Sequence, residues 1–185
     1  MTKQHDAAPG RPSSQDGGVP TTVAEAVQRA RAVLSTYLRI PESAARDLDR
    51  IDDGSPNVRA WASTTWRGLT ALADYARDVR EHGFTGGFWN WCVQQGAWPA
   101  SPKKLAMSES QTVANNAQMS AKRVFRVAKA VEPSGEIFMR AHLKISEGGG
   151  DLAPRVYFYD DTAGKTRQVH VGFVGPHYLV PNSKA

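Results

Sequence analysis

Three segments in the C-terminal half of the chain alternate apolar and polar side chains with the period of two that a β-strand requires. We expect strands at about 136–145, 154–160 and 168–174. The connections between them are rich in Gly, Asp and Thr and are too short for the crossover that joins parallel neighbours. The pattern therefore predicts an antiparallel meander. Segment 122–129, with β-branched and aromatic residues, predicts a fourth strand.

The preceding part of the chain carries apolar residues at helical spacing instead. We expect helices at about 22–39, 41–52, 55–81 and 108–120, and a short one around 88–92. Thr22 and Glu25 have the spacing of a capping box at the start of the first helix. This order of elements predicts an α+β fold, in which an N-terminal helical bundle packs on one face of a small antiparallel sheet of three or four strands.

A chain of 185 residues has the length of one ordinary domain. Residues 1–21 hold almost no large apolar side chain, so they predict a disordered tail. Residues 22–185 predict a single α+β domain with a helical part (22–98), a connecting helix (99–121) and a β-meander part (122–185). The expected core includes Trp61, Leu69, Leu72, Phe88 and Trp91.

Composition excludes several classes of protein. The single cysteine, Cys92, rules out an intrachain disulfide and a multi-cysteine zinc site, and its aromatic neighbours favour a buried structural thiol. No apolar run is long enough to span a membrane, and residues 1–18 lack the apolar core of a secretory signal. We therefore expect a cytoplasmic protein without a membrane partner, and we predict no cofactor.

Four side chains near the C-terminus have the chemistry of divalent-metal ligands. They are Asp160, Asp161, His170 and His177. Adjacent aspartates are equally typical of a turn after a strand. The sequence leaves this question open, and we predict no metal site.

The net charge of +5 has one source in the sequence. Basic and acidic residues balance in segments 1–100 and 131–185, whereas residues 101–130 hold six basic residues and one acid, Glu109. A concentrated basic segment favours polyanions, although a solvated helix end beside a basic edge strand has the same composition. Glu109 itself lies where an acid stabilises the start of the predicted polar helix.

Alternation along the predicted strands places several basic and aromatic side chains on the face opposite the apolar residues. If the apolar side packs on the helices, the outward face also carries His142 and His170, and the basic strand extends it. The predicted ligand-binding residues are Arg140, Lys144, Arg155, Tyr157, Tyr159, Lys122 and Arg126. Cationic side chains hold phosphates, and tyrosine rings stack on bases. A one-sided sheet would place polar residues there without any ligand as well.

Three functional hypotheses follow. The first is a domain that binds nucleic acid or another polyanion on this face. The second is a phosphodiester-cleaving enzyme with His142 and His170 as general acid and base, because imidazole titrates near neutral pH. The third is a protein-interaction domain that uses the helical bundle and segment 84–98. The five aromatic residues of that segment form either the hinge of the core or an exposed stacking platform.

Overall fold

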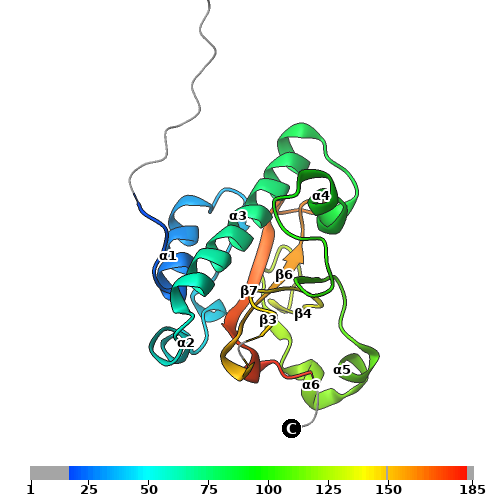
Figure 1. Ribbon diagram of the computed structural model, residues 1–185. Helices are drawn as coiled ribbons and strands as arrows, with labels where there is room; N and C mark the ends of the chain where they lie inside the picture. Colours follow the sequence, from blue (N-terminus) through cyan, green and yellow to red (C-terminus); the bar gives the residue numbers. More distant parts are fainter. Residues whose placement is uncertain (1–16, 149, 183–185) are drawn as a thin grey trace, which may run out of the picture.

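The helices expected in the first half of the chain are present with shifted ends, except that the one expected at 41–52 is divided. A short 3-10 helix (Glu42–Ala44) occupies its first part, and an α-helix begins only at Leu48. The computed structural model describes residues 17–148 and 150–182. Its longer helices are α1 (Val23–Val33), α2 (Leu48–Gly54), α3 (Val58–His82) and α4 (Gly87–Gln95). Within these residues, none of the helices is both long and apolar enough to cross a membrane. Figure 1 shows α3 crossing in front of the sheet, with α1 and α2 to one side and α4 at its upper end.

Local sequence chemistry explains where these helices begin and end. The Thr22 hydroxyl oxygen accepts a hydrogen bond from the backbone N–H of Glu25 at 3.1 Å, which confirms the capping box. Helix α3 ends at Gly83, whose φ of +68° is the left-handed conformation that commonly follows a helix. Helix α1 stops at Val33, earlier than expected, because the chain then leaves the helix to form strand β1 (Leu38–Arg39).

The predicted N-terminal tail is described only in part. Residues 1–16 lie outside the described residues. The carbonyl oxygens of Gly17 and Gly18 accept hydrogen bonds from Arg29 Nη1 at 3.2 and 2.6 Å. The stretch just before α1, which was predicted as part of the tail, therefore contacts this helix.

The main sheet has five strands in the order β1-β7-β6-β5-β2. Its centre is the expected antiparallel meander of β5 (Ala141–Lys144), β6 (Pro154–Asp160) and β7 (Val169–Pro176). Strand β1 pairs parallel with β7, and β2 (Leu105–Ala106) pairs antiparallel with β5. The α+β class is confirmed. The sheet is mixed rather than purely antiparallel, because the short strand β1 adds a parallel edge. The short strand β2 extends the opposite edge in the antiparallel sense.

The segment predicted as a fourth strand does not join this sheet. Strand β3 (Val124–Arg126) pairs with β4 (Glu136–Phe138) in a separate antiparallel ribbon. Two short helices, α5 (Gln111–Asn115) and α6 (Ala117–Ala121), replace the single helix expected before β3. Asn116 separates them, because its extended backbone ends α5 and its side-chain oxygen accepts hydrogen bonds from the first turn of α6.

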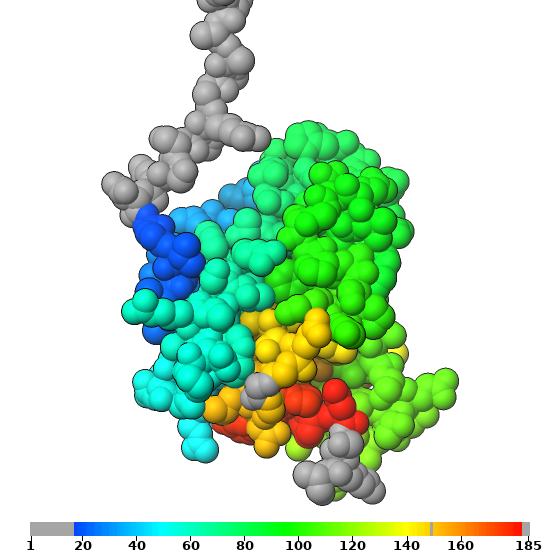
Figure 2. Space-filling view, viewed as in Figure 1, coloured from blue at the N-terminus to red at the C-terminus, as the bar shows by residue number. Residues whose placement is uncertain are grey.

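The sheet is covered on both faces, whereas packing on one face was expected. The larger core cluster joins α1–α4 to one face, and Figure 2 views the molecule from this helical side. The predicted core residues are buried there: Trp61, Leu69, Leu72, Phe88 and Trp91. A second cluster joins the ribbon and the C-terminal segment to the opposite face, and its buried members are Phe125, Met139, Tyr157, Phe173 and Val180.

Candidate nucleic-acid interface

The second layer covers most of the predicted ligand-binding face. Four of its residues are buried: His142, Arg155, Tyr157 and His170. Two are half-buried: Lys144 and Tyr159. Three are exposed: Lys122, Arg126 and Arg140. The open basic and aromatic sheet face that the alternation predicted is therefore not present.

Two local irregularities explain why this face is covered. Gly172 forms a β-bulge that shifts the register between β6 and β7, so Phe173 pairs with Tyr157 and lies on the same side of the sheet. A break between β4 and β5 turns Met139 to that side as well. Phe125 of the ribbon packs on these rings, with centroid distances of 5.5 Å to Tyr157 and 5.4 Å to Phe173.

A buried ion pair links the second layer to the sheet. Arg123 Nε donates to Glu109 Oε1 at 2.7 Å, and the two side chains are 0% and 3% exposed. The Tyr157 hydroxyl donates to the same carboxylate oxygen at 2.7 Å. Other guanidinium N–H groups of Arg123 donate to the carbonyl oxygens of Met119 and Val180. The pair thus connects α6, the C-terminal segment and the central strand β6.

Two of the predicted ligand-binding cations bond to the protein's own backbone. Lys144 Nζ donates to the Pro102 carbonyl oxygen at 2.9 Å. Arg155 Nη1 donates to the Pro154 carbonyl oxygen at 3.1 Å, and its side chain is largely enclosed. Both cations therefore satisfy backbone carbonyl groups of the protein itself.

The two histidines considered as general acid and base are both buried. The His142 ring stacks on Tyr157 with 4.5 Å between the ring centroids, and its Nδ1 lies 3.7 Å from Glu109 Oε1. Burial lowers the pKa of His142 to about 4 despite this carboxylate, and burial also lowers the pKa of His170. Strand β6 lies between the strands that carry the two rings. The geometry gives the phosphodiester-cleaving hypothesis no open active site.

The side chains considered as metal ligands form a different arrangement. Asp161 Oδ2 accepts hydrogen bonds from the backbone N–H of Thr166 at 2.8 Å and from its hydroxyl at 2.6 Å. Thr166 Oγ1 also lies 2.8 Å from His170 Nε2. Asp160 bonds elsewhere, and His177 lies beyond the end of β7. In the part of the chain that the structure describes, no three His, Cys, Asp or Glu side chains gather as an ion would require.

The aromatic segment 84–98 belongs to the core. Phe88 and Trp91 are at most 2% exposed, and Trp91 Nε1 donates to Asp78 Oδ2 at 2.7 Å. Burial raises the pKa of the Cys92 thiol to about 12, so the thiol stays protonated and is a poor nucleophile. The segment therefore matches the core interpretation, and its buried rings do not form an exposed stacking platform.

The three predicted ligand-binding cations that are exposed lie on the outer side of the ribbon. Phe125 and Ile137 point inward to the second core cluster, so the alternate residues of both strands point outward. Lys122 comes just before β3, and Arg140 comes just after β4. We name the ribbon surface by its five residues: Lys122, Val124, Arg126, Phe138 and Arg140.

Two hollows flank Val124, which is 42% exposed and lines both of them. The first, of about 340 Å³, is lined by Phe138, Arg140 and small residues of α5 and α6. The second, of about 260 Å³, is lined by Lys122 and Arg46, among others. Sequence reasoning missed Arg46, because its segment is distant in the sequence and reaches the ribbon through contacts with β7, among them the hydrogen bond from the Arg46 backbone N–H to the Val174 carbonyl oxygen.

The ribbon surface combines charge with an aromatic face. The Arg140 guanidinium lies over the Phe138 ring, 5.1 Å from its centroid. One acid accompanies the cations, because Glu136 is the cross-strand neighbour of Arg126. The arrangement provides cations for phosphate oxygens and flat groups on which a base stacks.

The fold and this surface define an α+β protein whose sheet is enclosed and whose exposed cations gather on a small ribbon. Comparisons with known proteins add no assignment, because the chain matches no family model, no curated protein and no solved structure.

Proposed function

We propose that the protein binds single-stranded nucleic acid on the ribbon surface. The observation that carries this proposal is the exposure of Lys122, Arg126 and Arg140 on the ribbon, with the Arg140 guanidinium over the Phe138 ring, while the other predicted binding residues are buried or half-buried. Cations placed around an aromatic ring suit a ligand that carries both phosphates and bases.

The positive charge left on segment 101–130 supports the proposal, because the single acid of this segment is buried in an ion pair. Residues 101–130 contain six basic residues and one acid. That acid, Glu109, is paired with Arg123 in the interior. The segment is left with five other Lys and Arg side chains and no carboxylate, so its field attracts polyanions.

The pair formed by Phe138 and Arg140 favours a single strand over a duplex. Bases in a duplex are stacked on their neighbours, whereas unpaired bases stack on aromatic rings and guanidinium planes. The hollow of about 340 Å³ beside this pair is lined by small residues that leave room for a flat ring: Ala114, Ala117, Ser120 and Ala121. Lys122, just before β3, and Arg126, at the end of β3, then contact the phosphates.

Salt dependence of binding tests the proposal. Fluorescence anisotropy is measured with a labelled oligothymidylate and oligouridylate of about 12 nucleotides, between about 20 and 200 mM salt. Four cations, Arg46 and the three of the ribbon surface, should give a slope of log Kobs against log salt of about −3, at roughly 0.7 for each phosphate contact. Failure of both oligonucleotides to bind at the lowest salt would overturn the proposal.

Substitutions separate the charge contacts from the stacking contact. Lys122→Gln, Arg126→Gln and Arg140→Gln should each weaken binding and reduce the slope by about 0.7. Phe138→Leu should weaken binding by about 1–3 kcal/mol without changing the slope, because stacking releases no counterions. Lys165→Gln, which removes one exposed charge from the β6–β7 connection, is the matched control. A triple charge variant that binds as well as this control would also contradict the proposal.

A further inference from the structure

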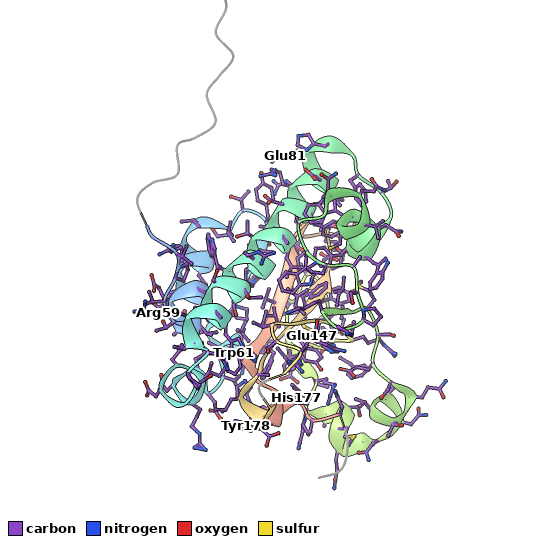
Figure 3. The ribbon with its side chains drawn as sticks, viewed as in Figure 1. Arg59, Trp61, Glu81, Glu147, His177 and Tyr178 are labelled. Atoms are coloured by element: carbon purple, nitrogen blue, oxygen red, sulfur yellow. The ribbon has the colours of Figure 1, made fainter. Side chains whose placement is uncertain are left out.

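A pocket at the C-terminal end of α3 shares no lining residue with the two hollows of the ribbon surface. Its volume of about 450 Å³ falls in the range of small-ligand sites. Its walls come from α3, the glycine-rich connection to α4 and the β6–β7 connection. In Figure 3, Glu81 marks this end of α3, and His177 and Tyr178 mark the opposite end of the molecule.

One part of the pocket is an exposed carboxylate held by two hydroxyl groups. Asp160 Oδ1 accepts hydrogen bonds from the backbone N–H of Thr162 at 3.0 Å and from its hydroxyl at 2.6 Å. Asp160 Oδ2 accepts a hydrogen bond from the Tyr75 hydroxyl. Tyr75 is 2% exposed, and burial together with Asp160 raises the pKa of its phenol, so the proton stays on Tyr75.

These hydrogen bonds leave only acceptors for a ligand at this end. Each hydroxyl group has one proton, and Tyr75 and Thr162 both donate theirs to Asp160. The remaining lone pairs of the two hydroxyl oxygens and of the carboxylate can only accept. The Asp160 carboxylate, surrounded by hydroxyl oxygens that can only accept, favours a ligand group that is positively charged and carries several N–H donors.

The β6–β7 connection adds the opposite charge to the pocket. Arg167 lines the pocket and is exposed, and no ion pair among the described residues involves its guanidinium. The other side chains of the pocket include the apolar Val79, Phe84 and Ala163. Gly86 and Gly87, with φ of +123° and +77°, form a wall without side chains, where a ligand can approach the backbone closely.

From this arrangement we infer that the pocket binds a small zwitterion with an apolar body. The ammonium group of the ligand donates to Asp160, its anionic group pairs with Arg167, and its body packs on Phe84. A reversed ligand would face a like charge at both ends, so the two residues also set its orientation. This site is independent of the nucleic-acid proposal, because the two surfaces share no residue.

An NMR titration of the full chain with four probes tests the inference. L-phenylalanine and L-phenylalanylglycine are zwitterions with different charge separations, phenethylamine carries only the cation, and 3-phenylpropionate carries only the anion. At least one zwitterion should shift the amide signals of Gly86, Gly87 and Ala163 and bind at least about tenfold more tightly than either singly charged probe. Equal affinities for all four probes, or no shifts at these amides, would show that the inference is wrong.

Two variants test separately whether Asp160 binds the cationic end of the ligand and Arg167 its anionic end. Asp160→Asn should weaken the zwitterion and phenethylamine by about tenfold and leave 3-phenylpropionate unchanged. Arg167→Asn should instead weaken the zwitterion and 3-phenylpropionate, and asparagine tolerates the φ of +57° at this position. Lys165→Gln, exposed in the same connection, is the control. Because Arg167 is on the surface, its variant tests the inference even if Asp160→Asn fails to fold; variants that behave like the control would refute it.

Discussion

Glu109 shows how tertiary contacts change the role of a single residue. The sequence places this acid at the start of a polar helix, where it would act on the helix dipole. In the structure Ser110 is the N-cap of α5, and the Glu109 side chain turns inward to Arg123 and Tyr157. A buried guanidinium is stabilised only while its anion is present, so this residue should matter for stability.

Glu109→Gln should lower the free energy of unfolding by about 3–5 kcal/mol, because it leaves the buried charge of Arg123 without its partner. Urea unfolding followed by circular dichroism measures this loss. Glu147→Gln, which alters an exposed carboxylate, is the matched control and should change the value by less than about 0.5 kcal/mol. A loss below about 1 kcal/mol for Glu109→Gln would show that the ion pair is not essential to the second layer.

At the scale of elements, the ribbon is held against β7 by a close approach at one glycine. A Cβ atom on Gly172 would lie 2.5 Å from Phe125 Cβ and 2.6 Å from Met139 Cε. Both neighbours belong to the second core cluster, so neither can move without disturbing the packing of the ribbon. Gly172 thus has two effects: its bulge turns Phe173 toward this cluster, and its missing side chain leaves room for Phe125 and Met139.

Gly172→Ala should therefore destabilise the protein by about 1–3 kcal/mol, through overpacking between the ribbon and β7. The free energy of unfolding in urea measures the effect. Gly18→Ala provides the comparison, because a Cβ there meets no atom within 4 Å. Equal stabilities of the two variants would mean that the ribbon is not packed closely on the sheet.

For the whole molecule, the two layers share their central strand. On β6, Phe158 packs in the larger core cluster and the adjacent Tyr157 packs in the second. Neither layer can lose this strand without exposing the apolar surface of the other, so we expect them to unfold together.

All five tryptophans belong to the larger core cluster or pack against it: Trp61, Trp66, Trp89, Trp91 and Trp98. Tryptophan fluorescence thus reports on the helical layer, whereas far-UV circular dichroism reports on all elements. Urea unfolding followed by the two signals should give the same midpoint. A fluorescence midpoint above the dichroism midpoint would show that the ribbon layer detaches first.

Only part of the candidate site could be predicted from the sequence, because strand alternation indicates which face a side chain is on but not what covers that face. Lys122, Arg126 and Arg140 were predicted as ligand-binding residues and are exposed. Arg155 and Tyr157 were predicted with them and are buried, because no local signal indicates a second layer over the sheet. Arg46 had no signal at all, since its place beside Lys122 depends on packing across the molecule.

The sequence by itself determined the elements whose signals lie within a few residues. The capping box at Thr22, the long amphipathic helix α3 and the bounds of β6 were all predicted, because each depends on local spacing. The tertiary structure alone decided the edge strands β1 and β2 and the second layer. Alternation carried through a β-bulge assigns every later side chain to the wrong face, so Gly172 was enough to reverse the expected position of Phe173. A bulge is stabilised by contacts between strands, and those contacts exist only once the chain has folded.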